Sequence, residues 1–382
     1  MSDLLIKNAV IYTPESKING WVRCENGKIT TIGEGRPPES TATIIDANGQ
    51  HLLPGFIDTH VHGAVNHDTM DADRDGLIAM ADFFASRGVT AFTPTTLTST
   101  HDKIMAALET VKTLINTEID GASIVGVHLE GPYLNVKKTG AQNPDFVRLC
   151  DPDEAQHYLD SGVLRVVSVA PEFLENHWLI EQCKSRGITA SIAHTMATYE
   201  ETLAGIEAGI SQSTHTYNAM TSLNHRKPGV VGAVMSDDRV NCELIADNIH
   251  VHPAAMKALW YAKGRDKISL ISDAMRAAGM PEGEYKLEDL TAFVKDGKAT
   301  LADGTLAGSV LTMDVAVKNF MAATGADLHT IMPTFSLNPA RTIGLDDCKG
   351  SIEAGKDADF VLLGNDISVQ KTIVGGRVVY QN

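Results

Sequence analysis

The chain has 382 residues, of which 43% are hydrophobic and 21% are charged, and its formal net charge is −16. This composition is typical of a globular protein with room for one large domain. The chain is acidic and has no dense stripe of Lys and Arg, which argues against nucleic acid or an anionic membrane as its main partner. No apolar run reaches the ~18 residues of a membrane helix, and five scattered cysteines form no disulfide or zinc pattern. We therefore expect a cytoplasmic protein without a signal peptide.

Both ends of the chain predict short β-strands joined by tight turns. Residues 1–51 mix β-branched residues with Asn-Gly turn signals, and residues 344–382 continue in the same style with glycine turns. We expect the two ends to pair into one small β-sandwich domain beside the segment that lies between them.

The middle of the chain, residues 52–343, alternates apolar strand-like runs with helical patterns. It contains eight strand candidates, most of them followed by a helix candidate, which predicts an α/β fold with a (β/α)8 TIM barrel. A doubly wound open sheet is the alternative, but it needs a Gly-rich phosphate turn after its first strand, and "GFIDTHVHGAVNHD" has none. The segment "PEGEYKLEDLTAFVKDGKATLADGTLAGS" predicts a β-hairpin inserted near the last strand.

Polar side chains stand where the predicted barrel strands end, which is where TIM barrels place their active sites. His60 and His62 are two residues apart on the first strand, so an extended chain points them the same way. The other residues of this kind are Glu130, His194, His215, Asp247, His250 and Asp273. Such a set is improbable as packing, because each buried polar group would need its own partner. Imidazole and carboxylate suit Zn²⁺, Fe²⁺ and similar ions, so the sequence predicts a metal site.

The order of these residues resembles that of the amidohydrolase superfamily: H-x-H after strand one, Glu after strand three, His after strands five and six, and Asp after strand eight. Shorter motifs, among them "HLEGPYLN", "GAQNP", "THTYNAM", "HRKPGVVGA" and "ISDAM", look like those of N-acetylglucosamine-6-phosphate deacetylases. The resemblance runs from about residue 50 to the C-terminus.

This resemblance implies an amide hydrolase that converts N-acetyl-D-glucosamine 6-phosphate to D-glucosamine 6-phosphate and acetate in amino-sugar catabolism. The alternatives are the N-acetylgalactosamine 6-phosphate epimer, a cyclic amide of the dihydroorotase kind, and a scaffold that has lost its chemistry. The absence of a strand-end lysine ligand disfavours the cyclic amide, and the retained ligands disfavour the scaffold. The sequence ties no residue to the hydroxyl that distinguishes the two sugar epimers.

The resemblance also implies which residues hold metal. Glu130, His194 and His215 would bind a first ion, and His60 and His62 would bind a second, with Glu130 as the bridge. One or two divalent ions per subunit are therefore expected, with Zn²⁺ as the first choice and Fe²⁺, Mn²⁺ or Co²⁺ as alternatives.

Catalytic and substrate roles follow from the same resemblance. Asp273 matches the general base that takes a proton from water and passes it to the leaving amine. Arg226 matches a phosphate-binding arginine that reaches the neighbouring active site in a homodimer. The other implied substrate contacts are Ala141, Gln142, Asn218, Ala219, Asp247, His250, Leu306, Ala307 and Gly308. Gln142 stands where some relatives carry a histidine beside the carbonyl oxygen of the substrate. Its amide would donate a hydrogen bond to this oxygen as negative charge develops there, but it would not carry a charge itself. The sequence leaves the role of His128 open.

Overall fold

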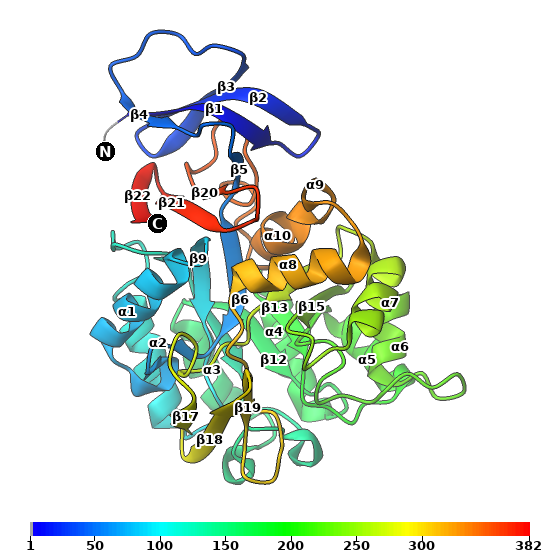
Figure 1. Cartoon of the computed structure of the whole chain (residues 1–382). Coiled ribbons are helices and arrows are strands. Elements are labelled where there is room, and N and C mark those ends of the chain that lie inside the picture. The colour runs from blue at the N-terminus through cyan, green and yellow to red at the C-terminus, as the bar shows by residue number, and fades with distance from the viewer. Residues whose placement is uncertain (1–2) are drawn as a thin grey trace.

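The computed structural model describes residues 3–382 (Figure 1). Its centre is a ring of eight parallel strands. These strands are β6 (Phe56–Val61), β9 (Val89–Pro94), β11 (Val127–Glu130), β12 (Leu164–Val169), β13 (Thr189–Ile192), β14 (Ile210–Ser213), β15 (Asn241–Ile245) and β16 (Ile268–Ile271). β6 pairs with β9, and β11 to β16 pair in sequence order. Single bridges, Thr95 to His128 and Val61 to Ala274, close the ring. The eight predicted strands therefore form a TIM-barrel-like fold.

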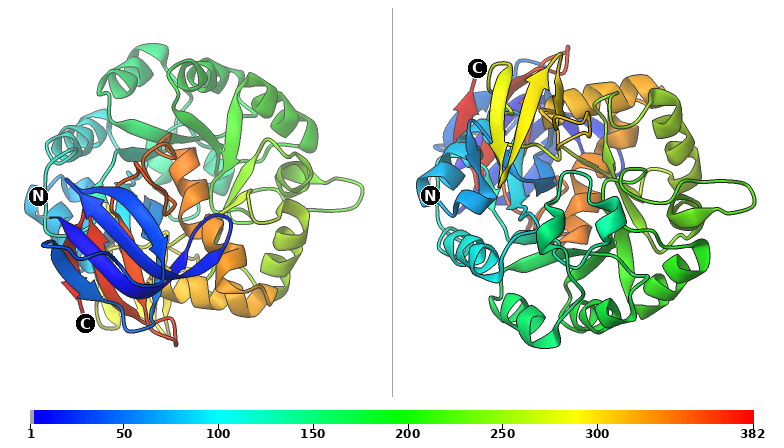
Figure 2. Two further views of the ribbon diagram at one scale, coloured as in Figure 1. Left: turned by 90° about the horizontal axis from the view of Figure 1, so that it is seen from above. Right: turned by 90° about the horizontal axis from the view of Figure 1, so that it is seen from below.

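Helices follow the barrel strands and surround the ring, as the two end-on views in Figure 2 show. They are α1 (Arg74–Ala85), α2 (His101–Lys112), α3 (Pro152–Asp160), α4 (His177–Ser185), α5 (Tyr199–Ala208), α6 (Gly229–Ser236), α7 (Pro253–Lys263), α8 (Met313–Thr324), α9 (Leu328–Ile331) and α10 (Leu337–Thr342). Asp73, Thr100, Asp151 and Thr198 cap four of them by accepting first-turn N–H groups, as short polar side chains do at helix starts. Within residues 3–382, no helix combines the length and the apolar character that crossing a membrane would require.

The two chain ends meet in one mixed sheet. Its strands are β1 (Leu4–Tyr12), β2 (Lys17–Glu25), β3 (Lys28–Glu34), β4 (Thr43–Asp46), β5 (His51–Pro54), β20 (Phe360–Leu363), β21 (Val369–Val374) and β22 (Arg377–Gln381). The sheet runs β22-β21-β20-β5-β1-β2-β3, and β4 pairs with β1. β5 and β20 are antiparallel, with Leu53 opposite Val361, so the two ends pair as their turn signals led us to expect. All eight strands belong to one continuous hydrogen-bonded sheet.

The insertion after β16 contains three antiparallel strands, one more than the expected hairpin. They are β17 (Gly283–Leu287), β18 (Leu290–Lys295) and β19 (Lys298–Thr300). Asp296 and Gly297, with φ of 50° and 73°, make the extra turn, because an Asp-Gly pair accepts the left-handed backbone of a tight hairpin.

The insertion lies at the opposite end of the barrel from the terminal sheet (Figure 1). The Glu288 side chain accepts hydrogen bonds from Ser99 Oγ at 2.8 Å and from Lys103 Nζ at 2.7 Å. These contacts fasten the insertion to the start of α2, beside the carboxyl ends of the barrel strands.

Candidate functional site

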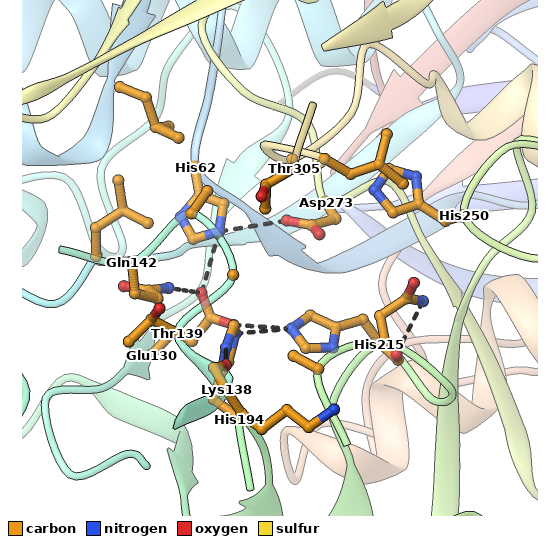
Figure 3. A pocket seen from close by; sticks show the side chains of 18 of the residues that line it. His62, Glu130, Lys138, Thr139, Gln142, His194, His215, His250, Asp273 and Thr305 are labelled. Atoms are coloured by element: carbon orange, nitrogen blue, oxygen red, sulfur yellow. Dashed lines mark hydrogen bonds and ion pairs between the residues drawn. The ribbon is translucent and has the colours of Figure 1, made fainter. Parts of the chain in front are cut away.

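A cavity of about 470 Å³ opens at the carboxyl ends of the barrel strands (Figure 3). Its floor consists of strand-end residues, namely His62, Glu130, His194, His215 and Asp273. Its walls come from loop 137–142, from Asn218, Ala219 and His250, and from insertion residues Leu287, Asp303, Thr305, Leu306 and Gly308. The volume falls within the range of sites for small molecules.

Glu130, His194 and His215 meet on this floor from three different strands. Glu130 Oε1 lies 3.2 Å from His194 Nε2 and 3.1 Å from His215 Nε2. The two Nε2 atoms are 3.1 Å apart, and all three side chains are buried. The structure therefore brings together the three residues that the sequence predicted as one ligand set.

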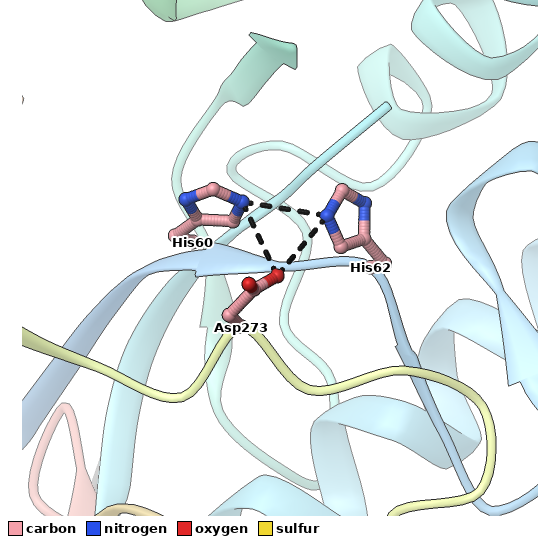
Figure 4. A group of neighbouring side chains, drawn as sticks. All are labelled: His60, His62 and Asp273. Carbon is pink, nitrogen blue, oxygen red and sulfur yellow. Dashed lines mark hydrogen bonds and ion pairs between the residues drawn. The ribbon is translucent and has the colours of Figure 1, made fainter. Parts of the chain in front are cut away.

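A second group contains His60, His62 and Asp273, whose side chains converge in Figure 4. Asp273 Oδ1 lies 3.5 Å from His60 Nε2 and 3.3 Å from His62 Nε2, and these two nitrogens are 3.3 Å apart. Glu130 Oε2 lies 3.3 Å from His62 Nε2, so Glu130 stands between the two groups (Figure 3). The sequence predicted Asp273 only as a proton carrier, and closure of the barrel places it beside the two histidines.

Unusual backbone conformations direct three of these side chains into the cavity. His194, His215 and Asp273 each lie two residues beyond a strand end, with φ of 42°, 30° and 50°. Non-glycine residues rarely adopt positive φ, and such strained backbone clusters at functional sites. Gly131, which follows Glu130, has φ of 78°, and a Cβ there would lie 2.1 Å from the Thr98 hydroxyl. Only glycine fits at this position.

Acceptors on the protein fix the proton positions of several imidazoles. His62 Nδ1 lies 3.2 Å from the Thr95 carbonyl oxygen, and His194 Nδ1 lies 2.7 Å from the Lys138 carbonyl oxygen. A carbonyl oxygen only accepts, so each Nδ1 donates, and in the neutral ring each Nε2 keeps its lone pair. Each Nε2 then faces carboxylate oxygens, which are also acceptors. This set of facing acceptors fits a cation between them, as in metal-binding histidines whose other nitrogen is anchored.

Opposite charges dominate the electrostatics of the floor. Burial disfavours protonation of His62, but Asp273 and Glu130 outweigh it and raise the pKa of His62 to about 9. Burial likewise favours the neutral form of Asp273, but His60 and His62 lower the pKa of this carboxyl to about 2. The carboxylates therefore stay ionised and attract positive charge into the site, so protons compete with a metal ion for the His62 nitrogen below about pH 9.

His128, whose role the sequence left open, does not line the cavity. Its Nδ1 donates to the Thr59 carbonyl oxygen at 3.0 Å, and its Nε2 lies 2.7 Å from Ser168 Oγ. Its ring packs edge-on against His60 with 4.5 Å between centroids, and burial lowers its pKa well below the usual value. Both ring nitrogens of His128 make hydrogen bonds within the protein, so its role is to pack against the ring of His60.

Glu243 is a residue that the sequence reasoning missed. It is a fully buried carboxylate on β15 whose Oε2 lies 3.2 Å from His60 Nδ1. The available signal was a lone glutamate inside the apolar run "VNCELIAD". A charged residue in such a strand is unusual unless it is paired.

The predicted substrate contacts divide into two sets. Seven of them line the cavity: Ala141, Gln142, Asn218, Ala219, His250, Leu306 and Gly308. Ala307 is buried beside it, and Asp247 lies under His250, with 2.6 Å between Asp247 Oδ2 and His250 Nδ1. Arg226 lies on an exposed loop away from the cavity of its own chain.

Gln142 is more constrained than the sequence indicated. Its amide donates to Glu130 Oε2 at 2.7 Å, and its oxygen accepts from the Thr98 backbone N–H at 2.7 Å. The side chain therefore orients Glu130, and its second amide hydrogen takes no part in these two contacts.

Comparisons with known proteins identify the family of the chain. Residues 51–379 match the model of the Amidohydrolase family. An N-acetylglucosamine-6-phosphate deacetylase of Bacillus subtilis (strain 168) is 38% identical over 384 residues, which cover 99% of this chain and 97% of that protein. An N-acetylgalactosamine-6-phosphate deacetylase of Escherichia coli O157:H7 is 38% identical over 338 residues, covering 88% of this chain and 89% of that one.

Solved structures lead to the same family. A mutant N-acetyl-D-glucosamine-6-phosphate deacetylase from Mycobacterium smegmatis, in complex with N-acetyl-D-glucosamine-6-phosphate, matches with a TM-score of 0.92 and 31% identity, covering 100% of both chains. The resemblance predicted from the sequence motifs is confirmed. The chain belongs to the amidohydrolase family, in the group of N-acetylglucosamine-6-phosphate deacetylases, and is a hydrolase that acts on an amide.

Proposed function

We propose that the enzyme converts N-acetyl-D-glucosamine 6-phosphate to D-glucosamine 6-phosphate and acetate, as a step of amino-sugar breakdown. The observation that carries this proposal is the pair of ligand groups joined by Glu130 on the floor of the cavity. The names of the relatives support the substrate, and the Escherichia coli relative makes N-acetylgalactosamine 6-phosphate the second candidate.

Acetate release from both sugar phosphates, each with and without its phosphate group, tests the substrate. We expect the glucosamine epimer to give the highest kcat/KM and the sugars without phosphate to be turned over poorly. A clear preference for the galactosamine epimer would instead establish the second candidate. Absence of acetate release from every one of these compounds would refute both.

The donor set fits one or two divalent cations. Glu130, His194 and His215 would hold the first, and His60 and His62 the second, with Glu130 shared and Asp273 adjacent. Zn²⁺ is the expected ion, with Fe²⁺, Mn²⁺ and Co²⁺ as alternatives, because nitrogen and oxygen ligands accept all of them. A bound cation supplies Lewis-acid polarisation of the acetamide carbonyl and lowers the pKa of the attacking water.

Asp273 is the proton carrier of this mechanism. Its carboxylate faces the cavity, and its low pKa keeps it able to accept a proton at neutral pH. It takes one proton from the water that attacks the acetyl carbon, and it delivers that proton to the amine nitrogen as the C–N bond breaks. The second amide hydrogen of Gln142 would donate to the carbonyl oxygen as negative charge develops there.

We propose a homodimer in which Arg226 binds the phosphate in the neighbouring subunit's cavity. Among the described residues that line the cavity there is no arginine, and the chain's own Arg226 is exposed. A phosphate dianion is best bound by paired guanidinium donors, so a second subunit is the source that completes the site.

Mixing two inactive variants tests this arrangement. We expect Arg226→Ala to raise KM strongly, and Asp273→Asn to lower kcat by about 100- to 10,000-fold. After the two proteins are mixed and allowed to exchange subunits, one site of each mixed dimer has an intact Asp273 and receives an intact Arg226. Statistical exchange should therefore restore about a quarter of the wild-type activity. Arg226→Ala mixed with itself is the control, and failure of the mixture to gain activity would refute a shared site.

His250 gives a pH-dependent prediction. Burial disfavours its charged form, but the hydrogen bond that His250 Nδ1 donates to the Asp247 carboxylate outweighs this and raises the pKa of His250 above 6.5. A raised pKa keeps the imidazole protonated beyond pH 6.5, and this charge is lost as the pH rises through the raised value. Loss of this positive charge should weaken binding of the anionic sugar phosphate, so KM for the sugar phosphate should increase with pH. In Asp247→Asn the increase should begin at lower pH, and KM for a substrate without phosphate should not follow this pattern.

We further infer that residues 52–343 form one domain, apart from residues 52–54, which pair with β20 in the terminal sheet. Residues 1–51 with 344–382 would form a small β-sandwich by folding this one continuous sheet over its own core, with residues 1 and 2 outside the described part. A separate apolar core that includes Ile6, Val22 and Phe360 supports this division. All five cysteines are free, which supports a cytoplasmic setting.

A further inference from the structure

Glu243 is a fully buried carboxylate that does not line the cavity. Its Oε1 accepts from Gln212 Nε2 at 2.7 Å and from Thr59 Oγ1 at 3.5 Å. Its Oε2 accepts from the His215 backbone N–H at 3.3 Å and lies 3.2 Å from His60 Nδ1. Each of these four hydrogen-bond partners of the carboxylate is thus a donor, with His60 becoming one when it carries its proton on Nδ1.

The position of Glu243 connects the two ligand groups of the floor. Through His60 it contacts the group that contains His62 and Asp273, and through the His215 backbone it contacts the group around Glu130. We propose that Glu243 is a positioning residue that holds His60 with its proton on Nδ1, so that Nε2 is free to bind the second cation. This inference rests on the metal site of the proposed function.

A different reading would make Glu243 itself a metal ligand, because His60, His128 and Glu243 also lie close together. The contacts of His128 argue against it. Its Nδ1 donates to the Thr59 carbonyl oxygen at 3.0 Å, and its Nε2 is engaged with Ser168 Oγ at 2.7 Å. No lone pair of His128 remains for a cation, so the contact of Glu243 with His60 is a hydrogen bond of the kind that orients metal-binding histidines.

The proposal predicts which of two substitutions of Glu243 weakens binding of the second ion more, Glu243→Gln or Glu243→Asp. Glu243→Gln preserves the size of the side chain but replaces one acceptor with a donor. Asn241 Nδ2 lies 3.3 Å from Gln212 Oε1, which turns Gln212 Nε2 toward position 243. The oxygen of the new amide would therefore face Gln212, and its NH₂ group would face His60 Nδ1. His60 would then have to move its proton to Nε2, where it blocks the cation.

Glu243→Asp has the opposite character. It shortens the side chain by one methylene and leaves a gap, but it keeps two acceptor oxygens and introduces no donor. A residue that mattered only for packing would tolerate Gln better than Asp, because the volume is conserved. A residue that fixes the proton of His60 should tolerate Asp better than Gln.

Calorimetric titration of the chelator-treated protein with Zn²⁺ separates these cases. We expect the unmodified protein to bind two ions per chain. Glu243→Gln should bind the first ion normally and the second about 10- to 100-fold more weakly, the usual cost of losing such a partner. The affinity of Glu243→Asp for the second ion should lie between those of the unmodified protein and of Glu243→Gln. Ser191→Ala is the matched control, because Ser191 is buried on β13 and contacts Thr214 but neither ligand group.

Several results would overturn the proposal: one ion per unmodified chain, an unchanged second affinity in Glu243→Gln, or a weaker second ion in Glu243→Asp than in Glu243→Gln. Imidazole ¹⁵N spectra of the unmodified, Zn²⁺-saturated protein give a test that needs no variant to fold. They should show His60 protonated on Nδ1, and a proton on Nε2 would also overturn it. Ion binding needs no substrate, so failure of acetate release would refute the proposed function while leaving these results intact.

Discussion

Asp273→Asn is expected to lower kcat by about 100- to 10,000-fold, the usual contribution of a positioned acid-base group. The substituted amide has the shape of the carboxylate but does not take the proton from water. Asp273 belongs to the group with His60 and His62, whereas Glu130 Oε1 contacts His194 and His215 instead. The ion on the Glu130 group should therefore remain bound, and KM should change much less than kcat. Steady-state acetate release together with metal analysis measures both effects.

The matched control for this experiment is Asp303→Asn. Asp303 also lines the cavity, but it comes from the insertion and belongs to neither ligand group. The same change of chemistry there should leave kcat within a few-fold of the unmodified enzyme. Near-normal turnover in Asp273→Asn would remove Asp273 from the mechanism. A loss of both ions in that variant would mean that Asp273 acts chiefly as a ligand.

The barrel and the order of its site residues could be predicted because both depend on local patterns. Strand periodicity places His60 on β6 and His62, one residue beyond its end, on the same side of the chain. The rule that TIM barrels work at the carboxyl ends of strands gathers Glu130, His194 and His215. The same periodicity places His128 on the side of Glu130, and the structure shows it one layer deeper. Its surroundings, and hence its role, depend on which strands face it across the barrel.

Other features depend on how distant segments meet, and the sequence could not supply them. Asp273 stands beside His62 because β16 closes the ring against β6 and because Asp273 has a left-handed backbone that strand periodicity does not predict. Glu243 becomes informative only when His60 is seen opposite it. Arg226 illustrates a different limit, since family resemblance implies a phosphate role for it, whereas the structure shows it on an exposed loop away from the cavity of its own chain.

Glu130→Gln is expected to impair both ligand groups at once. Glu130 Oε1 contacts His194 and His215, and Oε2 contacts His62 while accepting from Gln142. An amide offers one acceptor where the two groups need two, and its NH₂ would face either an Nε2 lone pair or the Gln142 amide. Both cations should therefore bind more weakly. Lewis-acid chemistry contributes several kcal/mol, so kcat/KM should fall by about 1,000-fold or more.

Three measurements distinguish loss of metal from loss of fold in this variant. Metal analysis should give less than one tightly bound ion per chain, and far-UV circular dichroism should remain unchanged. Added Zn²⁺ should raise the Tm of the unmodified protein, because a ligand that binds only the folded state stabilises it, and should raise the Tm of the variant much less. Glu181→Gln, an exposed position on α4, is the control and should behave as the unmodified protein. Two tightly bound ions in Glu130→Gln would refute Glu130 as the bridge and would leave the two ligand groups as independent sites.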